Sequence, residues 1–90
     1  MTETVALPAR LDFPAAAPLA QTFIGLRGQD ISVTADQVTL LGTNCLQVLL
    51  SAGRTWSADG KSLNYAGMSE AFVSQLKQFG LSPDALTEGT

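Results

Sequence analysis

Hydrophobic and polar residues alternate in three short segments, at 4–7, 30–34 and 62–66, as they do in half-buried β-strands. Pro8 ends the first segment, because proline cannot donate a hydrogen bond to a neighbouring strand. After a turn at 35–37, the apolar stretch 38–41 is expected to return to the core. The pattern predicts three strands with a short fourth apolar segment before the middle of the chain.

Three other segments carry apolar residues at every third or fourth position, which is the spacing of one helix face. These residues are Leu19, Phe23 and Leu26 in the first segment, Leu46, Leu49 and Gly53 in the second, and Phe72, Leu76 and Phe79 in the third. Ile24 is expected beside the first of these faces. Ser69 is a good N-cap for the third helix, and Gly80 suits the left-handed position that ends it.

The predicted order is therefore strand, helix, strand, helix, strand, helix, which is typical of an α/β domain with a mostly parallel sheet. A chain of 90 residues is expected to form a single domain, 1–90. Residues 84–90 follow the last predicted helix and Pro83, so we expect a frayed tail there.

Charged residues make up only 14% of the chain, against about 25% in an average protein, which predicts a neutral, weakly hydrated surface suited to partner contact. The net charge is −3. The basic residues are scattered and form no stripe, which argues against binding to nucleic acid or to an anionic membrane surface. They are Arg10, Arg27, Arg54, Lys61 and Lys77.

Catalytic and metal-binding patterns are absent from the sequence. There is no histidine, the carboxylates are spread singly, and no phosphate-binding glycine motif or CxxC pair occurs. We therefore expect no enzyme activity, no cofactor and no metal. Cys45 is interpreted as a small buried hydrophobe, with a reactive thiol near a helix N-terminus as the alternative.

The sequence also shows no recognisable targeting signal. A lone cysteine fits a reducing compartment, the first residues do not read as a signal peptide, and no apolar run approaches the roughly 18 residues of a membrane span. The sequence therefore predicts a cytoplasmic protein without direct membrane insertion.

The loop from Asp36 to Asn44, before the central helix, is the candidate site, because ligands of open α/β sheets bind at the carboxyl ends of strands. Asp36 is interpreted as a turn former. Thr43 is expected to cap the helix, and recognition or modification of its hydroxyl is the alternative. The polar helix stripe Asn44, Gln47, Ser51 and Arg54 is either an ordinary solvated face or a docking face that loses water at low cost.

Three segments resemble the STAS domain family, which includes the anti-sigma factor antagonists. They are residues 38–50, with residues 7–12 before them, and residues 69–81, which look like the last helix of the family. The run Leu46-Gln47-Val48-Leu49-Leu50 and Trp56 look most like small stand-alone STAS proteins found alongside bacterial chemotaxis genes. The resemblance implies a mixed, mostly parallel sheet of about four strands, with helices mainly on one side.

The resemblance also implies a switch site at the start of the central helix. In the family this loop often reads Asp-Ser-Ser-Gly-Leu, and a partner kinase phosphorylates the second hydroxyl residue. The matching positions here run from Gly42 to Leu46, with Asn44 in place of the phosphoacceptor. Thr43, one position earlier, is the remaining candidate phosphoacceptor.

The resulting expectation is a regulatory protein-interaction module that binds through Asp36, Gly42, Thr43, Asn44, Gln47, Ser51 and Arg54. The departure from the family motif favours constitutive binding over a phosphoswitch at Thr43. The partners implied are a histidine-kinase-like ATPase, an anti-sigma factor or a chemotaxis component. The alternative is a structural accessory subunit of a lipid-transport ABC complex, held against its ATPase. Apolar surface left over from a small core also allows a homodimer.

Overall fold

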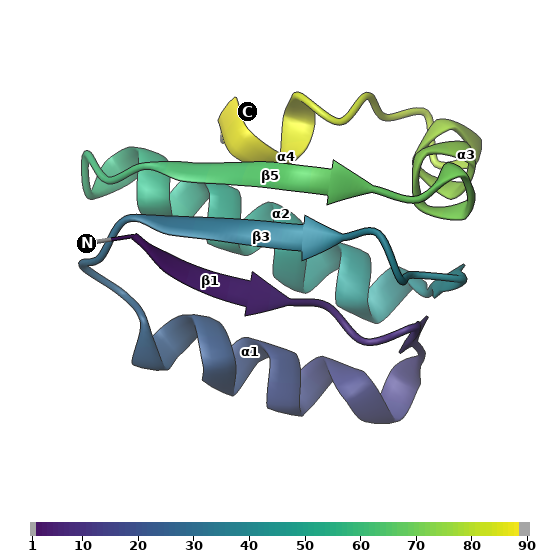
Figure 1. The fold of residues 1–90 in the computed structure, drawn as a ribbon, viewed down its shortest axis with the longest axis horizontal. Coiled ribbons are helices and arrows are strands. Elements are labelled where there is room, and N and C mark those ends of the chain that lie inside the picture. Colours follow the sequence, from purple (N-terminus) through teal and green to yellow (C-terminus); the bar gives the residue numbers. More distant parts are fainter. Residues whose placement is uncertain (1, 89–90) are drawn as a thin grey trace.

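Three parallel strands form the main sheet of this α/β protein, whose computed structural model describes residues 2–88 (Figure 1). The strands are β1 (Glu3–Ala6), β3 (Ile31–Ala35) and β5 (Leu63–Met68), and they pair in the order β1-β3-β5. Two short strands, β2 (Arg10–Leu11) and β4 (Leu40–Leu41), form a separate parallel pair. The predicted α/β class with a mostly parallel sheet is confirmed, although the main sheet has three strands rather than about four.

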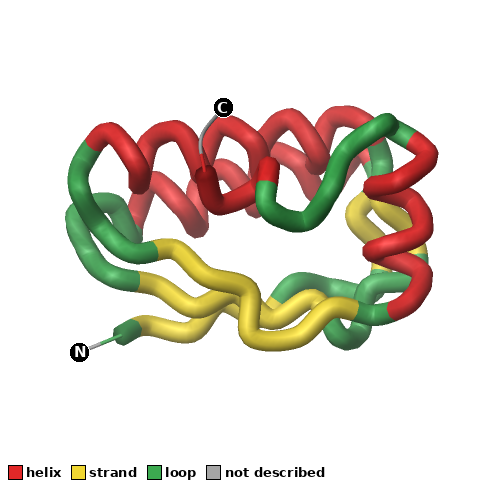
Figure 2. The backbone as a smooth tube through the Cα atoms, turned by 90° about the horizontal axis from the view of Figure 1, so that it is seen from above, coloured by secondary structure: helices red, strands yellow, loops and turns green. Residues whose placement is uncertain are grey.

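The helices lie mainly on one side of this sheet, as the view from above shows (Figure 2). A 3₁₀ turn, η1 (Phe13–Ala15), leads into α1 (Ala16–Gly25), and α2 (Thr43–Ala58) is the longest helix. After β5 come α3 (Glu70–Gln78) and the short α4 (Ala85–Glu88). Helix α3 lies beyond the carboxyl ends of the strands, and α4 lies near β5 (Figure 1). No helix in residues 2–88 is long and apolar enough to cross a membrane.

The core lies between the sheet and the helices. Ile31, Val33 and Ala35 of β3 are fully buried beneath the helices, while Ser32 and Thr34 between them lie on the opposite face and are half-buried. This is the alternation that predicted the strand. The buried side chains form one continuous cluster, so each element contributes to a shared core. Its members include Leu11, Leu41, Leu49, Trp56, Phe72 and Leu86.

Helix α3 begins and ends as the sequence predicted. The Ser69 hydroxyl accepts a hydrogen bond from the Phe72 N–H at 3.0 Å, which satisfies one of the free donors in the first helical turn. At the other end Gly80 has a φ of +78°, a left-handed conformation that glycine adopts without steric cost. Both capping predictions are confirmed.

The expectation of a frayed tail from residue 84 is wrong for residues 84–88. These residues form the turn that leads into α4 and the helix itself, and Leu86 is completely buried. Room for this packing comes from Gly53 of α2, where a Cβ atom would overlap the Leu86 carbonyl oxygen. Residues 89 and 90 lie outside the described residues.

Candidate docking surface

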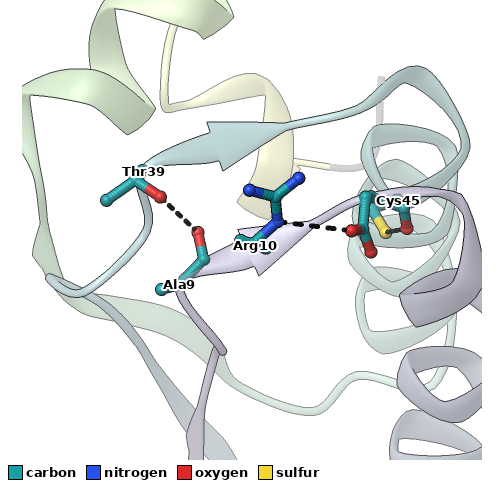
Figure 3. Close-up of polar contacts among 5 residues, drawn as sticks. Ala9, Arg10, Thr39 and Cys45 are labelled. Atoms are coloured by element: carbon teal, nitrogen blue, oxygen red, sulfur yellow. Dashed lines mark hydrogen bonds and ion pairs between the residues drawn. The ribbon is translucent and has the colours of Figure 1, made fainter.

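The strand pair β2–β4 positions the start of α2. The Thr39 N–H and hydroxyl both donate to the Ala9 carbonyl, at 2.7 and 3.1 Å, so the two strands begin side by side (Figure 3). At the other end of the pair, the Gly42 N–H donates to the Leu11 carbonyl at 2.8 Å. A Cβ atom on residue 42 would lie 2.9 Å from that oxygen, so the strand end can approach this closely only because residue 42 is glycine.

Gly42, rather than Thr43, is the N-cap of α2. Gly42 has an extended conformation, with φ −85° and ψ 160°, and no side chain caps the helix. The prediction that the Thr43 hydroxyl caps α2 is therefore wrong, because the helix begins one residue earlier than that role requires. Thr43 instead stands in the first helical turn with its side chain exposed. Its hydroxyl is accessible to a partner or a modifying enzyme.

Cys45 is a buried core residue, as interpreted from the sequence. Its sulfur donates to the Asp12 carbonyl at 3.3 Å (Figure 3). Burial raises the pKa of the Cys45 thiol, and the negative charge of Asp12 adds to this effect. Because the thiolate is the reactive form, the environment of Cys45 lowers its reactivity.

A groove of about 620 Å³ runs between α1 and α2, and we call it the α1–α2 groove. The α1 wall consists mostly of small side chains, from Ala16, Ala17, Ala20, Phe23 and Ile24. The α2 wall consists of Asn44, Gln47, Val48, Ser51, Ala52 and Thr55. Neither wall contributes a charged residue. The groove exists because small residues on both helices leave the space between them unfilled.

The two helices are fastened together near their C-terminal ends. Phe23 packs edge-on against Trp56, with ring centroids 5.9 Å apart, and the Trp56 indole N–H donates to the Gln29 carbonyl. Arg27 binds both carboxylate oxygens of Asp59, at 3.0 and 3.3 Å, and this hydrogen bonding lowers the pKa of the Asp59 carboxyl. At the other end of the groove, the Cys45–Asp12 hydrogen bond ties the start of α2 to the segment that leads into η1, while no hydrogen bond or ion pair among the described residues joins Ala16 or Ala17 to α2.

A second hollow adjoins the first at the start of α2. We call it the N-terminal hollow, and it is lined by Asp12, Phe13, Leu40, Gly42, Thr43 and Asn44. Two of its apolar residues are exposed, Phe13 to 77% and Leu40 to 38%. Asn44 lines both the groove and the hollow, so the two form a continuous surface.

The structure brings five of the predicted site residues together on this surface. Gly42, Thr43 and Asn44 line the N-terminal hollow, and Asn44 continues into the groove with Gln47 and Ser51. Asp36 and Arg54 are exposed but line neither depression. We use the name docking face for the four exposed residues Thr43, Asn44, Gln47 and Ser51.

The sequence interpretation missed the apolar side of this surface. Ile24 was expected beside the buried helix face, yet it is 65% exposed and lines the groove. The reason is geometric, since α1 turns only Leu19 and Phe23 fully into the core. A usable signal was present, because α1 contains no charged residue in its 10 positions, which is unusual for a helix at the surface.

The side chains of this surface are of kinds that a partner can cover at low cost. Amide, hydroxyl and apolar side chains lose water at lower cost than charged ones when a partner covers them. Within residues 2–88, no group of three or more histidine, cysteine, aspartate or glutamate side chains could hold a metal ion. No protein-family model, no curated protein and no solved structure matches the chain.

Proposed function

We propose that this chain is a non-enzymatic regulatory module that binds a signalling protein through the docking face and the adjoining α1–α2 groove. The observation that carries the proposal is an exposed surface that combines hydrogen-bonding groups on α2 with exposed Phe13 and Ile24 on the neighbouring segments, and in which Asp12 is the one charged lining residue. Burial of the α1–α2 groove, whose lining has no charged residue, removes apolar area from water without leaving a charge unpaired there.

The resemblance to the STAS family supports the same surface. Residues 38–50, which carry much of that resemblance, run through β4 and the first half of α2 and include the whole docking face except Ser51. On this basis the proposed partner is a histidine-kinase-like ATPase, an anti-sigma factor or a chemotaxis component in the cytoplasm. The module resembles an anti-sigma factor antagonist in this role.

We further propose that binding is constitutive. Asn44 holds the position of the family phosphoacceptor and cannot accept phosphate. Thr43 is exposed, and a phosphate there would add about −1.5 to −2 charges. That charge would lie at a helix N-terminus, which tolerates it, but also in the hollow that contains Asp12 and on an otherwise uncharged face. Phosphorylation of Thr43 would therefore weaken binding.

The test is site-specific photo-crosslinking in the native cell. A benzophenone amino acid replaces Gln47 in one variant and Gln78, an exposed glutamine on α3, in the matched control. We expect a specific adduct with a signalling ATPase, an anti-sigma factor or a chemotaxis protein from position 47 and none from position 78. Mass spectrometry of the same sample reports whether Thr43 carries phosphate.

Binding of the captured partner is then measured with Gln47→Glu and Gln78→Glu. We expect Gln47→Glu to weaken binding by about tenfold or more, because the new carboxylate must lose its water without a counter-ion, while Gln78→Glu leaves binding unchanged. Equal binding by both variants would show that the partner does not bind through the docking face. A stoichiometric, non-exchanging complex with a transporter ATPase would instead identify the chain as an accessory subunit.

A further inference from the structure

We call the segment from Ser82 to Glu88 the strap, and its residues 82–87 make no hydrogen bond to the rest of the described chain. Each hydrogen bond recorded for residues 82–87 has both partners within the strap: the N–H groups of Ala85, Leu86 and Thr87 donate to carbonyls three residues earlier, and the Thr87 hydroxyl donates to Asp84. The strap starts just after Leu81, whose N–H still bonds to the Leu76 carbonyl of α3. Within residues 82–87, the attachment of the strap to α2 and β5 therefore depends on apolar contact.

The contact with α2 includes Leu86. Its side chain is completely buried, and its backbone carbonyl lies against Gly53 of α2, where any larger residue would collide with it. A glycine in the middle of a 16-residue helix destabilises that helix. At position 53 the glycine nevertheless permits the close approach of the Leu86 carbonyl. We call the surface beneath the strap, which includes Gly53, the slot. It accommodates one leucine side chain and one turn of backbone.

Tyr65 of β5, which lies next to the strap, has an unsatisfied polar group. Its hydroxyl is buried and has no hydrogen-bond partner among the described residues, and Tyr65 lines a hollow together with Pro83, Asp84 and Thr87. A buried donor without a partner destabilises the arrangement that buries it. An opening of the strap that exposed this hydroxyl to water would give it the hydrogen bonds that it lacks here, and this would lower the free energy of opening.

We propose that the strap opens as a unit after Leu81, and that the slot beneath it is a second docking site for a leucine-bearing helical turn of a partner protein. The strap itself indicates the chemistry of the partner segment. That segment would place a leucine in the position of Leu86, and small residues beside the leucine would let its backbone approach Gly53. A partner that also offers an oxygen acceptor to the Tyr65 hydroxyl would bind better than the strap does, because it satisfies the group that the strap leaves unpaired.

This slot is separate from the docking face. Gly53 follows Asn44 by nine residues, which is about two and a half helical turns, so the two lie on opposite sides of α2. The proposal therefore stands or falls independently of partner binding through Asn44, Gln47 and Ser51.

The first test is amide hydrogen exchange measured by NMR on the full chain. In the wild-type protein we expect amides 84–87 to exchange by local opening, at least about tenfold faster than those of β3, which exchange only on global unfolding. Gly53→Ala should accelerate exchange in the strap further, while Gly25→Ala, where an added Cβ has open space in α1, should not. Exchange of the strap at the same rate as β3, in the wild type and in Gly53→Ala, would show that it does not open separately.

The second test asks whether the slot accepts a segment in trans. The ¹⁵N-labelled Leu86→Ala protein, whose strap has lost its anchor, is titrated with an unlabelled peptide of residues 82–88 and with a control peptide carrying alanine in place of leucine. We expect saturable shifts of the Gly53 and Tyr65 amide signals with the leucine peptide alone. Identical behaviour of the two peptides, or no shift with either, would overturn the assignment of the slot.

Discussion

Helices α3 and α4 both follow β5 and both bury apolar side chains completely, yet they are attached in different ways. Helix α3 places Phe72 and Leu76 in the core and adds polar ties: the Ser69 hydroxyl donates to the Val38 carbonyl, and the Gln75 side chain accepts from the Leu41 N–H and donates to the Thr39 carbonyl. Helix α4 places only Leu86 in the core and has no such tie in the described residues.

The difference shows that apolar burial and hydrogen bonds contribute to the attachment of a helix in different ways. Apolar burial is non-directional, so it favours a position without excluding sliding or lifting. Hydrogen bonds to particular backbone atoms fix a position, because each requires a short distance and a narrow angle. Through Gln75, α3 holds β4, and β4 leads directly to Gly42 and the start of α2. The docking face therefore depends on α3 although no α3 residue lines it.

The largest expected effect comes from removing the apolar anchor of α3. Phe72→Ala should lower the free energy of unfolding by about 3–5 kcal/mol, since it leaves a cavity in the shared core. Urea denaturation followed by the fluorescence of Trp56, the single tryptophan, measures this. A loss below about 1 kcal/mol would mean that burial of Phe72 does not fix α3 to the core.

A smaller loss is expected from removing the amide clamp alone. Gln75→Ala should cost about 1–3 kcal/mol, because the Leu41 N–H and the Thr39 carbonyl lose their partner on that side. Gln78→Ala, on the exposed side of the same helix, is the matched control and should change stability very little. If the two variants unfold at the same urea concentration, the clamp does not contribute to stability.

The smallest effect on stability at neutral pH is expected for Tyr65 of β5, which lines a hollow together with Pro83, Asp84 and Thr87 next to α4. Tyr65→Phe removes a hydroxyl that has no partner among the described residues, so stability should stay the same or rise slightly. Burial raises the pKa of Tyr65 well above its ordinary value of about 10. The folded protein thus keeps this proton after the unfolded chain has lost it, and stability should fall as the pH rises above about 10.

The same residue provides the measurement. Tyr65 is the single tyrosine, so phenolate absorbance reports its ionisation directly, and urea midpoints between pH 9 and about 11 report the stability. Tyr65→Phe should lack this part of the pH dependence. An ordinary titration near pH 10 in the folded protein would instead place the hydroxyl in contact with water.

The sequence predicted the elements whose signals are local. The alternation in β3, the Ser69 cap and the left-handed Gly80 each depend on a few neighbouring residues, and all three are present. The N-cap of α2 was misplaced because Gly42 and Thr43 are both acceptable caps, and only the close approach of Leu11 decides between them.

Features that depend on distant residues could not be predicted in the same way. Leu86 looked like part of a free tail because its seat, Gly53, lies more than 30 residues away and looked like an ordinary position on an apolar stripe. Likewise, half of the docking surface comes from η1 and α1, whose exposed Phe13 and Ile24 resemble core residues in the sequence. The α2 half was predictable, since neutral polar residues at helical spacing mark an exposed face.

The Gln75 clamp also has a consequence for how this protein meets other chains. Strand β4 pairs with β2 on one side, and the Thr39 carbonyl and Leu41 N–H on its other side would otherwise be open to an extended peptide. The Gln75 amide occupies both groups, as a passing strand would do. This short edge is therefore closed to strand addition and to edge-to-edge aggregation, and a partner that approaches here must recognise side chains rather than backbone.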